Sequence, residues 1–196
     1  MKKSWIIIIV IVLMLLWLGF SAQSSYNSMV EKNESVSNQW AQVENVYQRR
    51  ADLIPNLVNT VKGYAEHEKS TFTAVIEARS KATAVNIDAN NLDAASFQKF
   101  QEAQDGLSSA LSKLMVVMER YPDLKANQNF LELQAQLEGT ENRITVERMK
   151  FNDVSKDYNT YIKKFPKNLW ASMFNFEAKE YFKAQEGAEK APEVKF

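Results

Sequence analysis

The stretch YNSMVEKNESVSNQWAQVENVYQRRADLIPNLVNTVKGYAEHE, residues 26–68, decides the fold of this 196-residue chain. Positions three or four residues apart follow one register without a slip, and ten of the thirteen are apolar or aromatic. Twelve steps cover 42 residues, and the mean spacing of 3.5 is typical of a coiled-coil-like helical seam. The seam consists of Tyr26, Met29, Asn33, Val36, Trp40, Val43, Tyr47, Arg50, Ile54, Leu57, Val61, Tyr64 and Glu68.

This seam predicts one long helix over residues 26–68. Pro55 lies inside it, removes a main-chain donor and clashes with the preceding turn, so we expect a kink or a short break near Leu53. The unbroken register favours the kink.

Three later segments repeat the helical spacing, with candidate N-caps at Ser70 or Thr71, at Asp93 and at Asn127. They are residues 70–85, 93–121 and 127–165. Four amphipathic helices joined by short connectors predict an all-α protein whose residues 23–165 form an antiparallel up-and-down four-helix bundle with long coiled-coil-like helices. The expected core includes Trp40, Leu57, Leu111, Leu133 and Phe151.

Helix lengths predict which part of the long pair is covered. At a rise of about 1.5 Å per residue, the first and last helices are about 63 and 58 Å long, and the two between them about 24 and 43 Å. The shorter helices therefore cover only the distal part of the long pair.

The segment 166–196 begins with an aromatic tail that no disordered linker would carry. A short helix capped by Asn168 would present its apolar side chains, and the chain beyond Phe182 is expected to fray. The tail either pads the exposed stalk, lies in the membrane interface or docks a partner, and padding is the simplest reading. The side chains offered for membrane-proximal or partner contact are Trp170, Met173, Phe174 and Phe176.

A four-residue tail, residues 1–4, precedes an uncharged apolar run at residues 5–22. Eighteen helical residues span about 27 Å, close to the roughly 30 Å hydrocarbon core, so the run predicts a transmembrane anchor. The alternative is a cleaved signal peptide, with Gly19 and Ser21 small enough for a cleavage site. Lys2 and Lys3 place the N-terminus in the cytoplasm and the remainder outside it, across a bacterial inner membrane.

Composition excludes several classes of function. The chain has 24 basic and 24 acidic residues, no cysteine and one histidine. Zero net charge argues against nucleic-acid binding, and the missing cysteines exclude thiolate chemistry and cysteine-ligated metal. His67 lacks a second imidazole for a histidine-rich metal site and is interpreted as capping the turn after the first helix. We therefore predict no cofactor and no catalytic activity.

Charged residues on or beside the predicted seams need partners if they are buried. Their structural interpretation is a polar seam of ion pairs that sets helix register, and their functional interpretation is a pocket for an anionic ligand or a peptide. Counting from the two distal turns pairs Arg50 with Glu141 and leaves Glu119 for Arg79 or Lys62. The polar seam consists of Arg50, Glu68, Arg79, Glu119, Glu141 and Arg148.

Local strings add a resemblance. The strings RRADLIPNL at residues 49–57 and YPDLKA at residues 121–126 resemble the LemA family of bacterial membrane proteins, and the likeness extends from residue 1 to about 182. The resemblance implies a membrane helix followed by a LemA-like four-helix bundle, and it implies no reaction, cofactor or ligand.

Together these patterns predict a single-pass, membrane-anchored scaffold or adaptor at the bacterial cell envelope. Its partners would be the lipid bilayer, through residues 5–22, and an unidentified envelope protein. The alternative is a small-ligand or peptide sensor domain that acts through a partner subunit.

Overall fold

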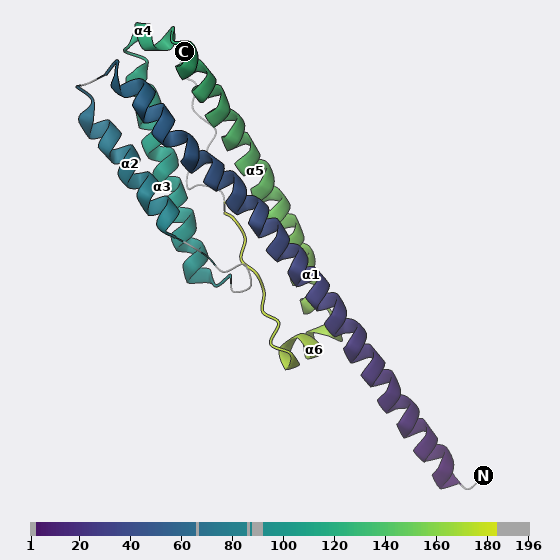
Figure 1. Ribbon diagram of the computed structural model, residues 1–196. Coiled ribbons are helices and arrows are strands. Elements are labelled where there is room, and N and C mark those ends of the chain that lie inside the picture. Colours follow the sequence, from purple (N-terminus) through teal and green to yellow (C-terminus); the bar gives the residue numbers. More distant parts are fainter. Residues whose placement is uncertain (1–2, 66, 86, 88–91, 184–196) are drawn as a thin grey trace, which may run out of the picture.

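The computed structural model describes residues 3–65, 67–85, 87 and 92–183 and is all-helical, with no strand in those parts of the chain (Figure 1). Its helices are α1 (Lys3–Lys62), α2 (Lys69–Ala84), α3 (Ala94–Met118), α4 (Pro122–Lys125), α5 (Gln128–Lys163) and α6 (Lys167–Met173).

The first helix joins the apolar run and the predicted seam into one element of 60 residues. Pro55 lies inside α1 without interrupting it, so the less favoured alternative, a short break, does not occur. By length and composition the N-terminal part of α1 is a candidate membrane span: an 18-residue window has a mean hydropathy of 2.8, and none of it is buried. Figure 1 shows this part projecting beyond all other helices.

Several predicted helix ends are wrong by a few residues. The helix expected to reach residue 68 ends at Lys62, because the turn that follows is closed by main-chain hydrogen bonds from Tyr64 and Ala65 to the Val61 carbonyl. Asp93 and Asn127 are the side-chain N-caps of α3 and α5, as predicted. The cap expected at Ser70 or Thr71 is wrong, because both residues lie inside α2.

The same correction applies to Asn168. It lies inside α6, and Pro166 precedes this helix without a side-chain cap bond. The short connector expected at residues 123–126 contains the single turn α4, which begins at Pro122.

Helices α1 and α5 lie side by side along most of α5, whereas α2 and α3 lie along the part of α1 distant from the apolar end (Figure 1). Along α1 and α5 the contacts run in opposite residue order: Lys32 meets Asp157, Gln39 meets Glu147 and Arg50 meets Glu141. We call residues 25–183 the helical body.

Two apolar clusters fill the helical body. The cluster nearer the apolar end contains Met29, Val36, Trp40, Val43, Tyr47, Ile87, Leu92, Phe97, Phe100, Ile144, Phe151, Tyr158, Ile162, Ala171 and Phe182. The distal cluster contains Ile54, Leu57, Val58, Val61, Ala65, Phe72, Val75, Ala82, Leu107, Leu111, Leu114, Met118, Leu124, Phe130 and Leu137. Four of the five predicted core side chains are buried, and Leu133 is half-buried at the edge of the distal cluster.

Candidate functional site

A buried arginine lies between the two apolar clusters. Arg50 is 1% exposed, and its Nη1 donates to Glu141 Oε1 at 2.6 Å and to Ser108 Oγ at 2.8 Å. Its Nη2 donates to Gln104 Oε1 at 2.6 Å and to the Gln104 carbonyl at 3.3 Å. The Tyr47 ring lies 5.1 Å from the guanidinium carbon. The predicted Arg50–Glu141 pair therefore forms, within a network that stabilises the buried charge.

This network extends to the α2–α3 side of the helical body. Gln104 is itself buried and donates to the Ala82 carbonyl at 3.2 Å. Arg79 donates from Nε to the Ala51 carbonyl at 2.7 Å, so the predicted pairing of Arg79 with Glu119 is wrong. Sequence reasoning included Arg50 and Glu141 but missed Gln104 and Ser108. Gln104 could have been found, because it is the one polar residue in the apolar stripe of residues 97–118.

The remaining members of the predicted polar seam are dispersed. At the distal turns, Glu68 accepts from the Tyr121 hydroxyl at 3.1 Å and lies 3.8 Å from Arg120. Glu119 pairs with Lys125 at 2.6 Å because the chain reverses at α4, so Lys62 is not its partner either.

Arg148 lies near the middle of α5 and donates to the Lys183 carbonyl at 2.9 Å. His67 is exposed in the turn between α1 and α2, where main-chain groups make the closing hydrogen bonds. In the described residues, no three His, Asp or Glu side chains gather as metal ligands would.

Two open grooves lie beside α3. One, of about 750 Å³, lies between α3 and α5 and is lined by Ser108, Glu141 and Asn142 among others. Ser108 and Glu141 both bind Arg50, so two side chains of the network line this groove, whereas Arg50 itself lies buried behind them.

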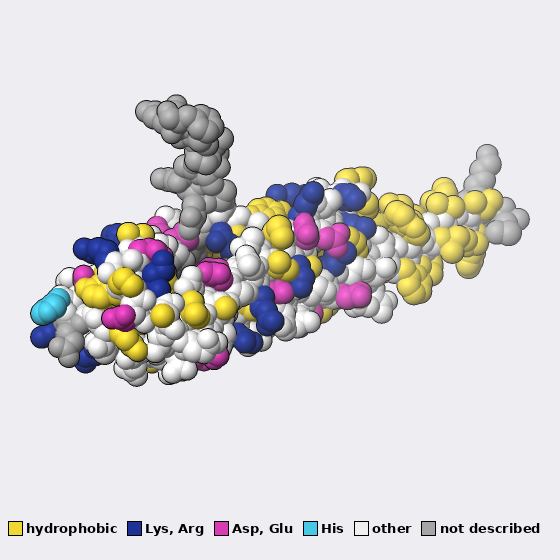
Figure 2. Space-filling view, turned by 90° about the horizontal axis from the view of Figure 1, so that it is seen from above, with side chains coloured by type: hydrophobic (Ala, Val, Ile, Leu, Met, Phe, Trp, Pro, Cys, Tyr) yellow, Lys and Arg dark blue, Asp and Glu magenta, His cyan; other side chains and the backbone are white. Residues whose placement is uncertain are grey.

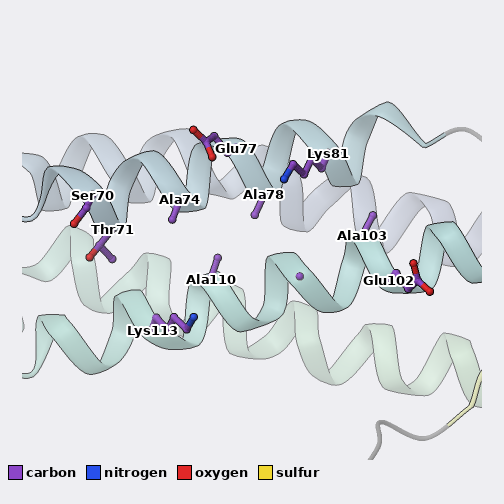
Figure 3. A pocket seen from close by; sticks show the side chains of 11 residues that line it. Ser70, Thr71, Ala74, Glu77, Ala78, Lys81, Glu102, Ala103, Ala110 and Lys113 are labelled. Carbon is purple, nitrogen blue, oxygen red and sulfur yellow. The ribbon is translucent and has the colours of Figure 1, made fainter.

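The other groove, of about 460 Å³, lies between α2 and α3 (Figure 3). Ala74, Ala78, Ala103 and Ala110 point into it, and its rim carries both signs of charge. The rim charges are Glu77, Lys81, Glu102 and Lys113.

The aromatic tail divides into an outward and an inward set. Met173 and Phe174 are 65% and 38% exposed, whereas Trp170 and Phe176 pack against the cluster nearer the apolar end. Leu169 and Phe165 are also exposed, and we call Phe165, Leu169, Met173 and Phe174 the foot. Figure 2 shows hydrophobic side chains covering the anchor end, whereas both signs of charge are intermixed over the visible face of the helical body.

The foot lies close to the apolar run. The Phe174 ring contacts the Tyr26 ring edge-on, with centroids 5.0 Å apart. Tyr26 follows Phe20 by six helical residues, or about 9 Å along α1. The expectation that the tail pads the stalk therefore accounts for part of it, and the foot faces solvent beside the candidate span.

Two asparagines to which sequence reasoning assigned no role hold the end of the tail. Asn159 and Asn152 on α5 each bind both the main-chain N–H and the carbonyl of one tail residue, at Lys179 and Phe182 respectively. The available signal was their spacing of seven residues, which places both on one face of α5.

Burial, aided by the nearby Glu177 carboxylate, raises the pKa of Tyr158 on the same helix to about 12.

Comparison with known proteins gives one family and several distant relatives. The model of the LemA family matches residues 39–196, a range that excludes the apolar run. Magnetosome protein MamQ 2 of Paramagnetospirillum magneticum is 26% identical over 175 residues, which cover 80% of this chain and 64% of that protein. Protein LemA of Metamycoplasma hominis is 21% identical over 160 residues, covering 82% of this chain and 69% of that protein.

Magnetosome protein MamQ of Magnetospirillum gryphiswaldense is 26% identical over 174 residues, with the same coverage as the first relative. The match thus spans slightly less than two thirds of the MamQ proteins. None of these three names states a reaction.

Proposed function

The chain belongs to the LemA family, and from this premise we propose that it is a membrane-anchored scaffold or adaptor whose work is binding rather than catalysis. The coarser statement, a membrane-associated helical protein, rests on the family and on the apolar helix. The proposed partners are the bilayer, through residues 5–22, and an envelope protein.

We also propose that residues 23–165 act as an antiparallel up-and-down four-helix bundle. Support comes from the opposite residue order of the contacts between α1 and α5 and from the position of α2 and α3 beside them. In this arrangement residues 166–183 strap the membrane-proximal half.

The observation that carries the proposal is the continuity of α1. One uninterrupted helix leaves the apolar run and becomes the seam of the helical body, so the height of the body above the bilayer is set by helix geometry. The foot then lies at the membrane interface, with Lys163, Lys164 and Lys167 beside it to meet anionic headgroups. A body held in one orientation presents fixed surfaces to a neighbour, as a scaffold requires.

The test is chemical cross-linking in cells followed by recovery of the tagged full chain in detergent. We expect one envelope protein to be recovered with the chain in a fixed ratio. The same protein should still be recovered when residues 5–22 are replaced by an unrelated apolar span. An unrelated single-pass protein with the same tag is the control. If no stoichiometric protein is recovered, the adaptor role is wrong.

Topology is a separate part of the proposal. We place the N-terminus in the cytoplasm and the helical body outside it, at the inner membrane, because Lys2 and Lys3 flank the run. Protease added to intact spheroplasts should then digest the body. Full protection would reverse the orientation, and a mature N-terminus near Ala22 would show that the run is cleaved.

A second candidate function has one specific observation in its favour. Glu141 is 44% exposed and lines the groove of about 750 Å³ beside Arg50, so an anionic ligand could replace it on the guanidinium. The chain would then be a ligand or peptide sensor that acts through a partner subunit. Stabilisation against heat by small carboxylates, lost in Arg50→Met, would support the sensor.

A further inference from the structure

The chain carries a basic segment where α5 ends and α6 begins. Lys163 is the last residue of α5, Lys164 follows it, and Lys167 is the first residue of α6. Residues 159–176 hold these three lysines and no aspartate or glutamate, although the whole chain has zero net charge. None of the three lysines forms an ion pair with a carboxylate of the described residues. The segment therefore presents positive charge to whatever lies beside it.

The Tyr161 ring holds one of these lysines in place. Lys167 Nζ lies 3.8 Å from the centroid of the ring, and Lys32 Nζ, which comes from α1, lies 5.5 Å from it. Lys32 is paired with the Asp157 carboxylate at 2.5 Å. The Tyr161 ring attracts the Lys167 ammonium without supplying a negative charge, so this ammonium is positioned and keeps N–H groups for an anionic ligand.

The foot lies next to these cations. Phe165 stands between Lys164 and Lys167 in the sequence and is 80% exposed. Leu169 and Met173 lie one helical turn apart on the exposed side of α6. Exposed apolar side chains beside cations match the chemistry of a membrane interface, where acyl chains meet charged headgroups.

The depth of the foot agrees with this chemistry. Helix α6 lies beside α1, and the Phe174 and Tyr26 rings are in contact (Figure 1). Tyr26 is four residues beyond Ala22, where the apolar run ends, which is about 6 Å along a helix. The headgroup region is roughly 5–8 Å thick on each side of the hydrocarbon core. When residues 5–22 span the bilayer, the foot therefore lies among the headgroups.

The lysines lie at a similar depth. Helices α1 and α5 run in opposite residue order, and Lys32 meets Asp157. Lys163 is six residues further along α5 than Asp157, so it lies level with Tyr26, six residues back along α1. Lys163 and Lys164 are thus at the depth of the lipid phosphates. The Lys167 ammonium, on the Tyr161 ring, lies slightly further from the hydrocarbon core.

We propose that Lys163, Lys164 and Lys167, together with the foot, form a binding site for the headgroups of anionic phospholipids. The foot enters the apolar side of the interface, and the ammonium groups bind phosphate oxygens. This inference rests on the proposed contact with the bilayer and deepens it, because residues 5–22 bring the segment to lipid. It adds a selectivity that an apolar span lacks, since the lysines distinguish anionic from zwitterionic headgroups by charge.

Lipid-selective quenching measures this selectivity. The natural chain has no cysteine, so Ser172→Cys, at an exposed position of α6, carries a single fluorophore. The labelled full chain is placed in phosphatidylcholine nanodiscs that contain a small fraction of a doxyl-labelled quencher lipid. The quencher is either phosphatidylglycerol or phosphatidylcholine with the same acyl chains, so the two preparations differ only in the headgroup of the quencher.

We expect phosphatidylglycerol to quench the fluorophore with an apparent affinity at least about fivefold higher than that of phosphatidylcholine, which is the effect of one lysine near an anionic surface. Raising the salt concentration from about 0.1 to about 1 M should reduce this preference, because the screening length falls from about 10 to about 3 Å.

Two triple variants with the same change of charge assign the preference to a place on the chain. Glutamine at all three lysines of the site should bring the two lipids to equal affinity. The control removes three exposed lysines from the distal part of the helical body and should keep the preference. The control substitutions are Lys62→Gln, Lys69→Gln and Lys113→Gln.

Equal quenching of the natural chain by the two lipids overturns the proposal. An equal loss of preference in both triple variants overturns it as well, because the overall charge of the body would then explain the selectivity. If circular dichroism shows that the triple variant of the site is unfolded, Lys163→Gln combined with Lys164→Gln must at least halve the preference. Both side chains are exposed, and an unchanged preference contradicts the site.

Extraction of membranes with alkaline carbonate separates this inference from the proposed anchor. A chain that carbonate removes is not anchored through residues 5–22, and the quenching ratio still decides whether the basic segment selects anionic lipid. A chain that resists extraction but is quenched equally by both lipids keeps the anchor and loses the anionic-lipid site.

Discussion

Arg50 and Glu141, 91 residues apart in the sequence, form an ion pair in which Nη1 and Oε1 are 2.6 Å apart, although the arginine side chain is 1% exposed and the carboxylate 44% exposed. The Arg50 guanidinium is therefore shielded from water, whereas the Glu141 carboxylate can be hydrated even without its partner. This asymmetry makes the two residues unequal in what their removal costs.

Glu141→Leu should be the more damaging single substitution. It leaves a buried cation without its counter-charge and should cost about 3 kcal/mol, near the low end for a broken buried pair because Ser108 and Gln104 still bind the guanidinium. Arg50→Met together with Glu141→Leu should recover most of that loss. Urea unfolding of the double-mutant cycle measures both, and Glu138→Leu, exposed on the same helix, is the control. If Glu141→Leu lowers the free energy of unfolding no more than Glu138→Leu does, the ion pair does not stabilise the fold.

Leu111→Ala should lower the free energy of unfolding by about 2–5 kcal/mol, because Leu111 is buried in the distal cluster and alanine leaves a cavity. Leu133→Ala should cost less, since Leu133 is only half-buried. Denaturant titrations compare the two variants with Val116→Ala, an exposed site on α3. A loss below about 0.5 kcal/mol for Leu111→Ala would mean that this face of α3 is solvated.

The foot should touch lipid. The natural chain has no cysteine, so a spin label at Met173→Cys reports one position only. In nanodiscs the label should be more accessible to oxygen, which concentrates in the bilayer, than to a water-soluble relaxation agent. A label at Lys150→Cys, exposed on α5, should show the reverse. Identical accessibility at both sites would place the foot in water.

Alkaline pH should destabilise the helical body through Tyr158. Burial raises the pKa of its hydroxyl from 10.0 to about 12, so the neutral form is favoured in the folded state. Its contribution to stability is fully present below about pH 10 and is lost as the pH rises towards 12. Thermal unfolding across this range should show a smaller decline for Tyr158→Phe than for the natural chain. If Tyr158→Phe and the natural chain lose thermal stability equally as the pH rises, groups other than Tyr158 cause the loss.

Residues with a helical period could be placed from the sequence. The seam positions from Met29 to Val61 are buried, apart from a half-buried Asn33, because burial along a helix follows from spacing alone. The caps at Asp93 and Asn127 were equally local, since each side chain bonds main-chain groups two or three residues away. Predicting the Arg50–Glu141 pair required one further step, which was to count residues along both helices from the two distal turns.

The tertiary structure alone decided the contacts that depend on where a non-helical segment runs. Phe182 carries no periodic signal, and its burial beside Trp40 requires the chain to turn back after α6, where Asn175 adopts a φ of 57°. Glu119 met Lys125 instead of Arg79 because α4 reverses the chain within a few residues. Sequence therefore determined the helices and their apolar faces, which are set by short-range periodicity. Only three-dimensional packing could bring Asn152 and Asn159 to the main chain of the tail, because main-chain groups are the same in every residue and leave no mark in the sequence.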